Sequence, residues 1–279
     1  MDDKEGQNFF STKAEHYFAT SRSHTQFKGF EKVFSSTAIT SQNPGHISFT
    51  IDNAVCDLPM LGIFNIDNAL SAIAATSAVG VPIQDATHAL ESFPGVPGRL
   101  EFILRKPFTV LVDYSPEPAS MQALYALAVT LDHERIIHVF GSAGGGRDVA
   151  RRPILGSIVG THADVAVVTN EDPYDEDPMQ IINQVAQGVI NVGRLHEHED
   201  LFQILDRREA IQLALSKAKP QDLVLITGKA CEQWIMGPLG TKQPWDDRRV
   251  CREELSKLGY LSTGYVDKKP EKVYTKRVE

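Results

Sequence analysis

The chain has 279 residues, 42% of them hydrophobic and 23% charged, a composition typical of a globular protein with one large or two modest domains. Its net charge of −8 disfavours a nucleic-acid-binding role, which usually needs a basic surface. No apolar run reaches the roughly 18 residues of a membrane-spanning helix, and the polar start MDDKEGQNFF does not resemble a secretory signal. We therefore expect a cytoplasmic protein that does not bind membranes.

Cysteine and histidine spacing predicts no metal site. Cys56, Cys231 and Cys251 are widely separated and form no CxxC pair, which argues against structural zinc and against a disulfide framework. Cys231 has no histidine at catalytic spacing, so we interpret it as structural. His196 and His198 form the one HxH pair, in a polar HEHED segment that we expect to be exposed.

The first part of the chain contains few clear elements. Residues 1–45 are polar with little periodicity, so no element is assigned there. From His46, the run HISFTIDNAVCDLPM alternates apolar and polar positions, which predicts a strand or hairpin. An Ala-rich stretch ending at Gly80 predicts a buried helix, and residues 83–92 predict a second. The segment FPGVPGR then marks a domain boundary near residues 94–98.

After this boundary, β-branched runs alternate regularly with helical patterns. This alternation predicts an α/β domain with a Rossmann-like, mostly parallel sheet and helices on both faces. In such sheets ligands bind at the carboxyl ends of the strands. The predicted strands are PFTVLVDYS, RIIHVFGS, DVAVVTNED, residues 201–205 and DLVLITGK, and the predicted helices cover residues 116–131, 150–162, 177–189, 207–217 and 247–258.

The loop GSAGGGRD follows the second of these strands and has four glycines within residues 141–146. Glycines let the backbone N–H groups approach an anion, and Arg147 can clamp a carboxylate or phosphate. The alternative is a tight turn between strand and helix. The loop is not a P-loop, because no Gly-Lys-Ser/Thr follows, and it breaks the GxGxxG dinucleotide spacing.

Acidic residues follow the third strand, in TNEDPYDEDP. We expect Glu171 and Asp172 at the strand tip, where a cationic substrate can be held. For residues 175–177 we favour the simpler interpretation as helix N-terminal charges, with Asp177 as the N-cap before Pro178.

The last strand ends in ITGKACEQW. Lys229 can contact a phosphate and Glu232 can bind an amine, although each is equally consistent with a surface charge.

Read in order, GIFNIDNALSA, PGRLE, VDYSPEP, FGSAGGGRD with RRP, TNEDPYDEDP and ITGKACE resemble the Mur ligases over roughly residues 46–260. The resemblance is greatest to the UDP-N-acetylmuramoyl-tripeptide synthetase branch, which adds the third amino acid of the stem peptide. It implies that residues 1–95 are the end of the central α/β ATPase domain and that residues 96–265 are the C-terminal, amino-acid-binding domain. Residues 266–279 are then a basic tail without expected structure.

The resemblance also implies roles for individual residues. The nucleotide site would include Asn65, Asn68 as the residue that reads adenine, Arg99 as an ATP contact, and Asp113 as the ribose ligand. Arg147 would grip the carboxylate of the incoming amino acid, and Glu232 would contact its side-chain end. The complete amino-acid site implied in this way is Arg147, Glu171, Asp172, Tyr174, Gly228 and Glu232, with Lys229 as a possible phosphate contact.

Some positions depart from the family pattern. Tyr174 stands where an arginine binds the distal carboxylate of meso-diaminopimelate, so an acidic tip without that arginine favours lysine or another basic diamino acid. Pro116 replaces the histidine after the Asp-Tyr pair, Ala230 and Cys231 replace a Gly-His pair, and the glycine loop is one residue longer.

The family uses ATP and Mg²⁺, and its P-loop lysine, magnesium-binding glutamate, carbamylated lysine and UDP-sugar domain belong upstream of the matched part. The sequence has no Gly-Lys-Ser/Thr, and its start resembles a segment late in the central domain. We therefore expect a fragment or one half of a split ligase, inactive alone and without tight ATP binding. Its partners would be ATP, an amino acid, a UDP-muramyl peptide and the missing N-terminal half.

Three alternatives stay open. One is a non-catalytic binding module, and another is a folylpolyglutamate synthase-like ligase, which shares part of the motif order. The third, an NAD-type oxidoreductase, is disfavoured by the position of the glycine loop.

Overall fold

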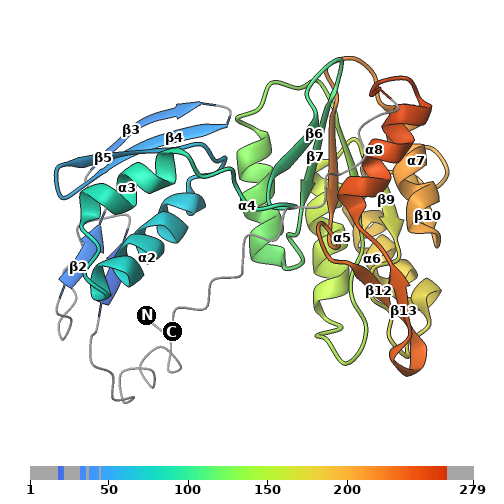
Figure 1. Cartoon of the computed structure of the whole chain (residues 1–279). Helices are drawn as coiled ribbons and strands as arrows, with labels where there is room; N and C mark the ends of the chain where they lie inside the picture. Colours follow the sequence, from blue (N-terminus) through green and yellow to red (C-terminus); the bar gives the residue numbers. More distant parts are fainter. Residues whose placement is uncertain (1–17, 22–31, 36–37, 44, 263–279) are drawn as a thin grey trace. The chain divides into compact units, whose positions relative to one another are not determined.

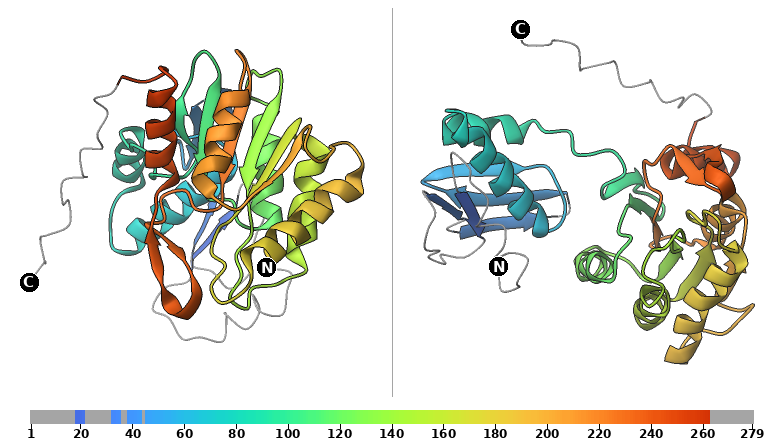
Figure 2. Two further views of the ribbon diagram at one scale, coloured as in Figure 1. Left: turned by 90° about the vertical axis from the view of Figure 1, so that its right-hand side faces the viewer. Right: turned by 90° about the horizontal axis from the view of Figure 1, so that it is seen from below.

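The structure is a computed structural model (Figures 1 and 2). The predicted basic tail, residues 266–279, lies outside the described residues, as do many of the residues before His46. No helix in the described part of the chain combines the length and the apolar character needed to cross a bilayer. The described residues are 18–21, 32–35, 38–43 and 45–262.

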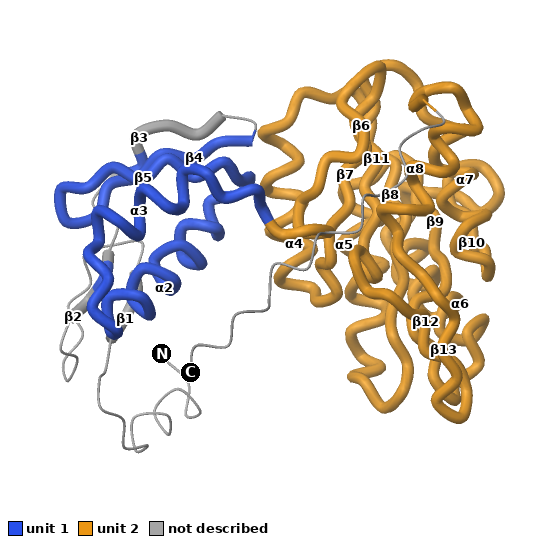
Figure 3. The backbone as a smooth tube through the Cα atoms, viewed as in Figure 1, with its two compact units in different colours: residues 1–95 blue, residues 96–279 orange. Residues whose placement is uncertain are grey.

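The chain divides into two compact units, Met1–Gly95 and Val96–Glu279, which Figure 3 distinguishes by colour. In unit 1, the segment from His46 forms the expected hairpin, with a turn at Asp52 and Asn53, both at positive φ. The strands of unit 1 are β1 (Phe18–Ser21), parallel to β2 (Lys32–Ser35), and the antiparallel β3 (Ala38–Asn43), β4 (His46–Ile51) and β5 (Ala54–Leu58).

Two helices complete unit 1, α2 (Phe64–Ala78) and α3 (Ile83–Glu91), close to the bounds that the sequence predicts. Helix α2 presents apolar residues at helical spacing, so one face is buried against the strands. Alternate residues of β4 meet that face, because side chains of a strand point to opposite sides in turn. The core consists mainly of Ile47, Phe49, Ile51, Cys56, Leu58, Ile66, Leu70 and Ile73.

Unit 2 has a six-stranded sheet in the order β10-β9-β8-β11-β7-β6, and the strands from β7 to β11 are parallel. This confirms the predicted α/β fold with a mostly parallel sheet. Its main elements are β6 (Glu101–Leu104), β7 (Thr109–Asp113), α4 (Pro118–Ala128), β8 (Ile136–Phe140), α5 (Arg151–His162), β9 (Val165–Thr169), α6 (Pro178–Val192), β10 (Leu201–Ile204), α7 (Arg207–Lys217), β11 (Leu223–Thr227) and α8 (Asp247–Lys257).

Helices cover both faces of this sheet, with α4, α5 and α6 on one side and α7 and α8 on the other (Figure 2). Alternate residues of the strands, such as Val110 and Val112, join the core with Ala210 and Ile211 of α7 and Val250 of α8. Both faces are buried, which explains why these strands read as continuous β-branched runs in the sequence.

Three strands of unit 2 and a 3-10 turn have no counterpart among the predicted elements. Strand β6 pairs antiparallel with β7 at the edge of the sheet, and its register shifts between Phe102 and Leu104. A short ribbon formed by β12 (Trp234–Met236) and β13 (Lys242–Pro244), with a 3-10 turn at Pro238–Gly240, follows β11. These strands are only three or four residues long, and no regular alternation with helical patterns marks them in the sequence, as it does for the equally short β10.

Helices α5 and α6 pack closely because glycines lie at their contact. A Cβ at Gly156 would lie 1.9 Å from the carbonyl oxygen of Val185, whereas at Gly160 the nearest atom would be 3.1 Å away. We expect Gly156→Ala to lower the free energy of unfolding by about 2 kcal/mol, because the helices must separate. Gly160→Ala is the matched control and should change it by less than about 1 kcal/mol. Urea denaturation of both variants checks this, and equal losses would contradict it.

Candidate functional site

The site is built where parallel strands end. Asp113 ends β7, Gly141 follows β8, Glu171 lies just beyond β9, and Gly228 follows β11. In the sheet these strands lie in the order β9-β8-β11-β7, so β11 is inserted between β7 and β8. Helices α4 and α5, which follow β7 and β8, cover one face of the sheet, whereas α8, which follows β11, covers the other. The chain therefore leaves neighbouring strand ends toward opposite faces at β11, the arrangement at which α/β sheets bind ligands.

Lys229 joins two of the predicted acidic residues. Its Nζ donates to Asp172 Oδ1 at 2.8 Å and to Glu232 Oε2 at 2.6 Å. The lysine is only 1% exposed, so the alternative of a surface charge does not hold for it. Because Asp172 follows β9 and Glu232 follows β11, the lysine connects loops from strands that β8 separates. We call Glu171, Asp172, Lys229 and Glu232 the acidic cluster.

Glu171 is the unusual member of the acidic cluster. It is 5% exposed, and among the described residues none donates a hydrogen bond to its carboxylate. Burial raises the pKa of Glu171 to about 7, against the opposing effect of Arg207 and Lys229. Gly228 is needed beside it, because a Cβ there would lie 2.7 Å from Glu171 Oε2. The site therefore holds a buried carboxyl that a bound cation would stabilise in its charged form.

Tyr114 borders the same cluster. Burial, together with the negative charge of Glu232 and Glu171, raises the pKa of its hydroxyl. The Arg99 guanidinium lies 4.4 Å above the Tyr114 ring, and Arg99 itself is exposed. Sequence reasoning did not select Tyr114, although it directly follows Asp113 in the VDYS motif.

The β12–β13 ribbon is hydrogen-bonded to the motif around Tyr174. Met236 N donates to Asp172 Oδ1 at 2.8 Å, and Tyr174 N donates to the Met236 carbonyl at 3.1 Å. Leu239 N donates to Asp175 Oδ1 at 2.7 Å. Tyr174 adopts a left-handed conformation, with φ at 51°. The ribbon that sequence reasoning missed thus fixes the residues that were expected to select the amino acid.

The glycine loop forms hydrogen bonds with other residues of the protein. Gly144 N donates to the Asp172 carbonyl at 2.7 Å. Glu176 accepts a 2.8 Å bond from Arg152, and together with the amides of Gly146 and Gly145 this lowers the pKa of Glu176. Asp177 is the N-cap of α6, as expected, with its side chain accepting from the Met179 amide at 2.9 Å.

Arg147 is exposed at the end of this loop, so its guanidinium faces solvent rather than the acidic cluster's interior. The exposed guanidinium is therefore open to a ligand carboxylate.

The four expected nucleotide residues fall in two units. In unit 1, Asn68 is exposed and its Nδ2 donates to Asn65 Oδ1 at 2.8 Å, while buried Asn65 donates to the Leu61 carbonyl at 2.6 Å. In unit 2, Asp113 accepts from Leu100 N at 2.9 Å and from the Ser115 hydroxyl. Each carboxylate oxygen keeps a second lone pair, so Asp113 and exposed Arg99 fit a ribose and a phosphate.

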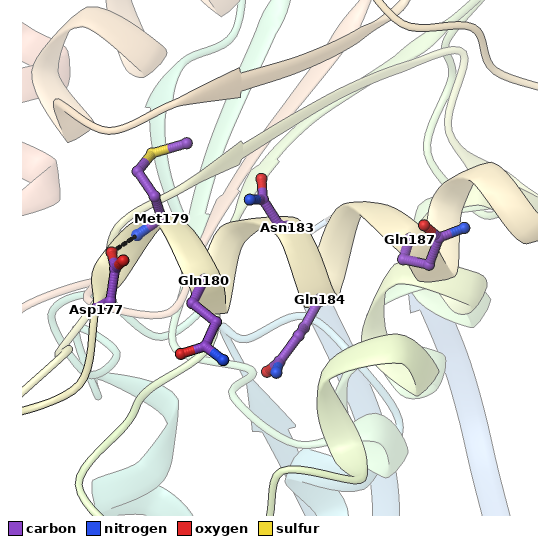
Figure 4. Close-up of a pocket in the computed structure, with 6 residues that line it drawn as sticks. All are labelled: Asp177, Met179, Gln180, Asn183, Gln184 and Gln187. Carbon is purple, nitrogen blue, oxygen red and sulfur yellow. Dashed lines mark hydrogen bonds between the residues drawn. The ribbon is translucent and has the colours of Figure 1, made fainter.

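A shallow pocket lies elsewhere, along helix α6 (Figure 4). It contains no member of the acidic cluster. Metal ligands are not clustered either: within the described part of the chain, no group of three His, Cys, Asp or Glu side chains can hold an ion. The pocket is lined by Asp177, Met179, Gln180, Asn183, Gln184 and Gln187.

Fold and site together define a Rossmann-like α/β domain with a candidate small-ligand site at the carboxyl ends of its parallel strands. The family model described as "Mur ligase, glutamate ligase domain" matches residues 98–230, so this part of the chain is a domain of the Mur ligase family. This confirms the resemblance seen in the motifs.

Named relatives agree. The chain is 43% identical over 204 residues to a UDP-N-acetylmuramyl-tripeptide synthetase of Roseiflexus sp. (strain RS-1), covering 73% of this chain and 40% of the relative. It is 40% identical over 173 residues to a UDP-N-acetylmuramoyl-L-alanyl-D-glutamate--2,6-diaminopimelate ligase of Alkaliphilus metalliredigens (strain QYMF). This match covers 61% of this chain and 34% of the relative. The chain thus spans well under half the length of these relatives.

The fold recurs in a solved structure from another branch. A folylpolyglutamate synthase of Mycobacterium tuberculosis, complexed with ADP and AMPPCP, superimposes with a TM-score of 0.56 at 21% identity, covering 71% of this chain and 47% of that one. Identity at this level shows a common fold alone.

Proposed function

We propose that this chain supplies the amino-acid pocket of an ATP-dependent, ADP-forming acid–amino acid ligase in cytoplasmic peptidoglycan precursor synthesis. The reaction would add a diamino acid to UDP-N-acetylmuramoyl-dipeptide. The observation that carries the proposal is the acidic cluster, where buried Lys229 pairs with Asp172 and Glu232 and the buried carboxyl of Glu171 lies beside them at the carboxyl ends of the strands. The match of residues 98–230 to the Mur ligase family supports it.

Charge favours a substrate with a distal ammonium. Lys229 already bridges Asp172 and Glu232, so Glu171 is the carboxyl left for a ligand. An ammonium beside Glu171 would favour the charged form of this buried group, and hydrogen bonds between charged partners are the strong ones. Tyr174 offers no cation for a distal carboxylate. We therefore propose lysine or a related basic diamino acid rather than diaminopimelate.

The chemistry divides between this chain and the remainder of the enzyme. When bound, ATP supplies the phosphoryl group that activates the dipeptide carboxylate as an acyl phosphate. This chain's residues would hold the amino acid, with Arg147 on its α-carboxylate and Glu171 and Glu232 at its far end, so that the α-amine is presented for attack. Such positioning lowers the activation barrier, because the amine loses its orientational freedom on binding and not in the reaction step. Arg99 and Asp113 would line the nucleotide side of unit 2, and no step through Mg²⁺ is assigned to these residues. Lys229 does not suit the expected phosphate contact, because it is buried and already bonded to Asp172 and Glu232.

The proposal predicts how the chain discriminates amino acids. In NMR titrations of the full chain, we expect lysine to bind at least about tenfold more tightly than norleucine, which lacks the ammonium. Tyr174→Arg should weaken the binding of lysine and strengthen the binding of meso-diaminopimelate, because it adds a cation that can bind a carboxylate.

The control is Tyr260→Arg, which adds the same charge at an exposed residue that contacts Phe108, at the amino end of β7. It should leave both affinities within about twofold, since exposed charges far from the site are screened. Equal binding of lysine and norleucine to the unmodified chain would refute the amine pocket.

A second use of the same pocket is a non-catalytic amino-acid-binding module, or one half of a split ligase acting with a separate N-terminal half. All four residues of the acidic cluster belong to unit 2, which is the observation in its favour. Adding a recombinant N-terminal half with a P-loop distinguishes the two: restored ADP formation with lysine and muramyl dipeptide supports the split ligase, and its absence supports the binding module.

A further inference from the structure

The acidic cluster lies on the loops after β9 and β11, and a buried arginine outside the cluster connects the ends of these two strands. Arg207, the first residue of α7, is 2% exposed. Its Nη2 donates to the Thr227 carbonyl at 2.6 Å, and its Nη1 donates to the Asn170 carbonyl at 3.1 Å. Thr227 immediately precedes Gly228, and Asn170 immediately precedes Glu171.

These two carbonyls belong to strand ends that are not neighbours. Strand β8 lies between β9 and β11, so Arg207 spans it from one end of the acidic cluster to the other. A planar guanidinium with donors in a fixed fork suits this task, because it sets the direction of each hydrogen bond.

The connection continues into the loop after β11 through Asp247. Arg207 Nε and Nη2 donate to the two carboxylate oxygens of Asp247, both at 2.8 Å. Asp247 Oδ2 also accepts from Ala230 N at 2.8 Å, and Asp247 N donates to the Ala230 carbonyl at 3.0 Å. Trp245 Nε1 donates to Asp247 Oδ1 at 2.8 Å.

Ala230 lies between the lysine and the glutamate of the acidic cluster and has a φ of 45°, a conformation that side-chain-bearing residues rarely adopt. Two hydrogen bonds with Asp247 hold it there, one donated by the Ala230 amide and one accepted by the Ala230 carbonyl. The direction of Lys229 toward Asp172 and Glu232 therefore depends on a backbone that the Arg207–Asp247 pair constrains.

We infer that Arg207 is a positioning residue, which sets the spacing of Glu171 and Glu232 and so the discrimination of the amino acid's distal group. This inference rests on the proposed function of the acidic cluster as an amine site. Arg207 touches no substrate in this scheme. It acts through the backbone of Asn170 and Thr227 and through Asp247.

Arg207→Lys tests the role, because an ammonium keeps the charge but cannot reach Asp247 and two carbonyls together. The readout is the ratio of lysine to norleucine affinity in NMR titrations of the full chain, with hydrogen exchange of the Ala230 amide. We expect the ratio to fall by about tenfold, since small displacements of positioned groups have large effects. The exchange of Ala230 should accelerate, while core amides of β8 stay protected.

If the role of Arg207 were merely structural, the substitution would weaken the binding of lysine and norleucine equally and leave the ratio of their affinities unchanged. Arg208→Lys is the matched control, because Arg208 is the next residue of α7 and pairs with Glu253 and Glu254 instead. It should leave the ratio within about twofold. If Arg207→Lys does not fold, Trp245→Phe removes only one hydrogen bond to Asp247 and should lower the ratio by a smaller factor.

The outcomes separate this inference from the proposed function. A wild-type preference for lysine that survives in folded Arg207→Lys, or in Trp245→Phe where that is the variant used, overturns the positioning role alone. No wild-type preference overturns the amine pocket, and the positioning role with it. A preference that is lost in Arg207→Lys but kept in Arg208→Lys supports both.

Discussion

Asp247→Ala is expected to lower the free energy of unfolding by about 3–5 kcal/mol, the usual result of removing one partner of a buried ion pair. Asp247 and Arg207 both have fully buried side chains. Without the carboxylate, the guanidinium keeps its bonds to two carbonyls but no neutralising charge, and the amide of Ala230 and the indole of Trp245 lose their acceptor. Water cannot readily replace these partners, so each loss adds to the effect.

The neighbouring Asp246 provides the matched control. It is the N-cap of α8, accepting from the amides of Arg248 and Arg249, and it pairs with the Arg248 side chain. Asp246→Ala should lower the free energy of unfolding by only about 1 kcal/mol, the usual effect of losing a cap. Urea denaturation of the two variants measures the difference. Similar losses for both would contradict the assigned importance of the Arg207–Asp247 pair.

Sequence patterns predicted the larger elements well, because those elements depend on local signals. Helix α7 begins and ends at the predicted residues, and Asp177 caps α6 before a proline, as its position indicates. The β-branched runs of β7, β8, β9 and β11 predicted buried parallel strands and hence the edge at which Asp113, Glu171 and Gly228 gather.

What the patterns could not show depends on contacts between distant segments. Lys229 looks like any other lysine until β9 brings Asp172 to its ammonium, 57 residues away in the chain. Arg207 likewise carries no local signal, since its partner Asp247 is 40 residues further on. A long polar side chain is usually exposed, so burial of either residue follows only from the complete set of partners.

Replacing Glu171 by glutamine is expected to stabilise the chain at pH 8 by as much as about 3 kcal/mol and to change little at pH 4. In the folded state, burial raises the pKa of this carboxyl from 4.5 to about 7. The folded chain therefore holds the proton where the unfolded chain has released it. Stability is highest below about pH 4.5 and falls as the pH rises toward 7, and glutamine cannot lose a proton.

Buried His138 makes stability depend on pH in the opposite sense. Its ring bonds to the Tyr125 hydroxyl at 2.7 Å and to Thr227 Oγ1 at 3.0 Å, and burial, with a contribution from Arg207, lowers its pKa from 6.5 to about 3. The unfolded chain then binds the proton first, so stability is complete above about pH 6.5 and falls as the pH drops toward 3. In the unmodified chain the two slopes oppose each other between about pH 4.5 and 6.5.

Glu171→Gln should remove the contribution of Glu171 to the pH dependence of stability and leave the contribution of His138. Urea denaturation from pH 4 to 8 should then show stability rising up to about pH 6.5 and staying level above it. Exposed Glu199→Gln is the control and should keep the profile of the unmodified chain. A profile for Glu171→Gln that still falls between pH 6.5 and 8 would contradict the assignment. A loss of stability at Glu171 near neutral pH is what an amine-binding site predicts, because the ammonium of a bound ligand would restore that stability.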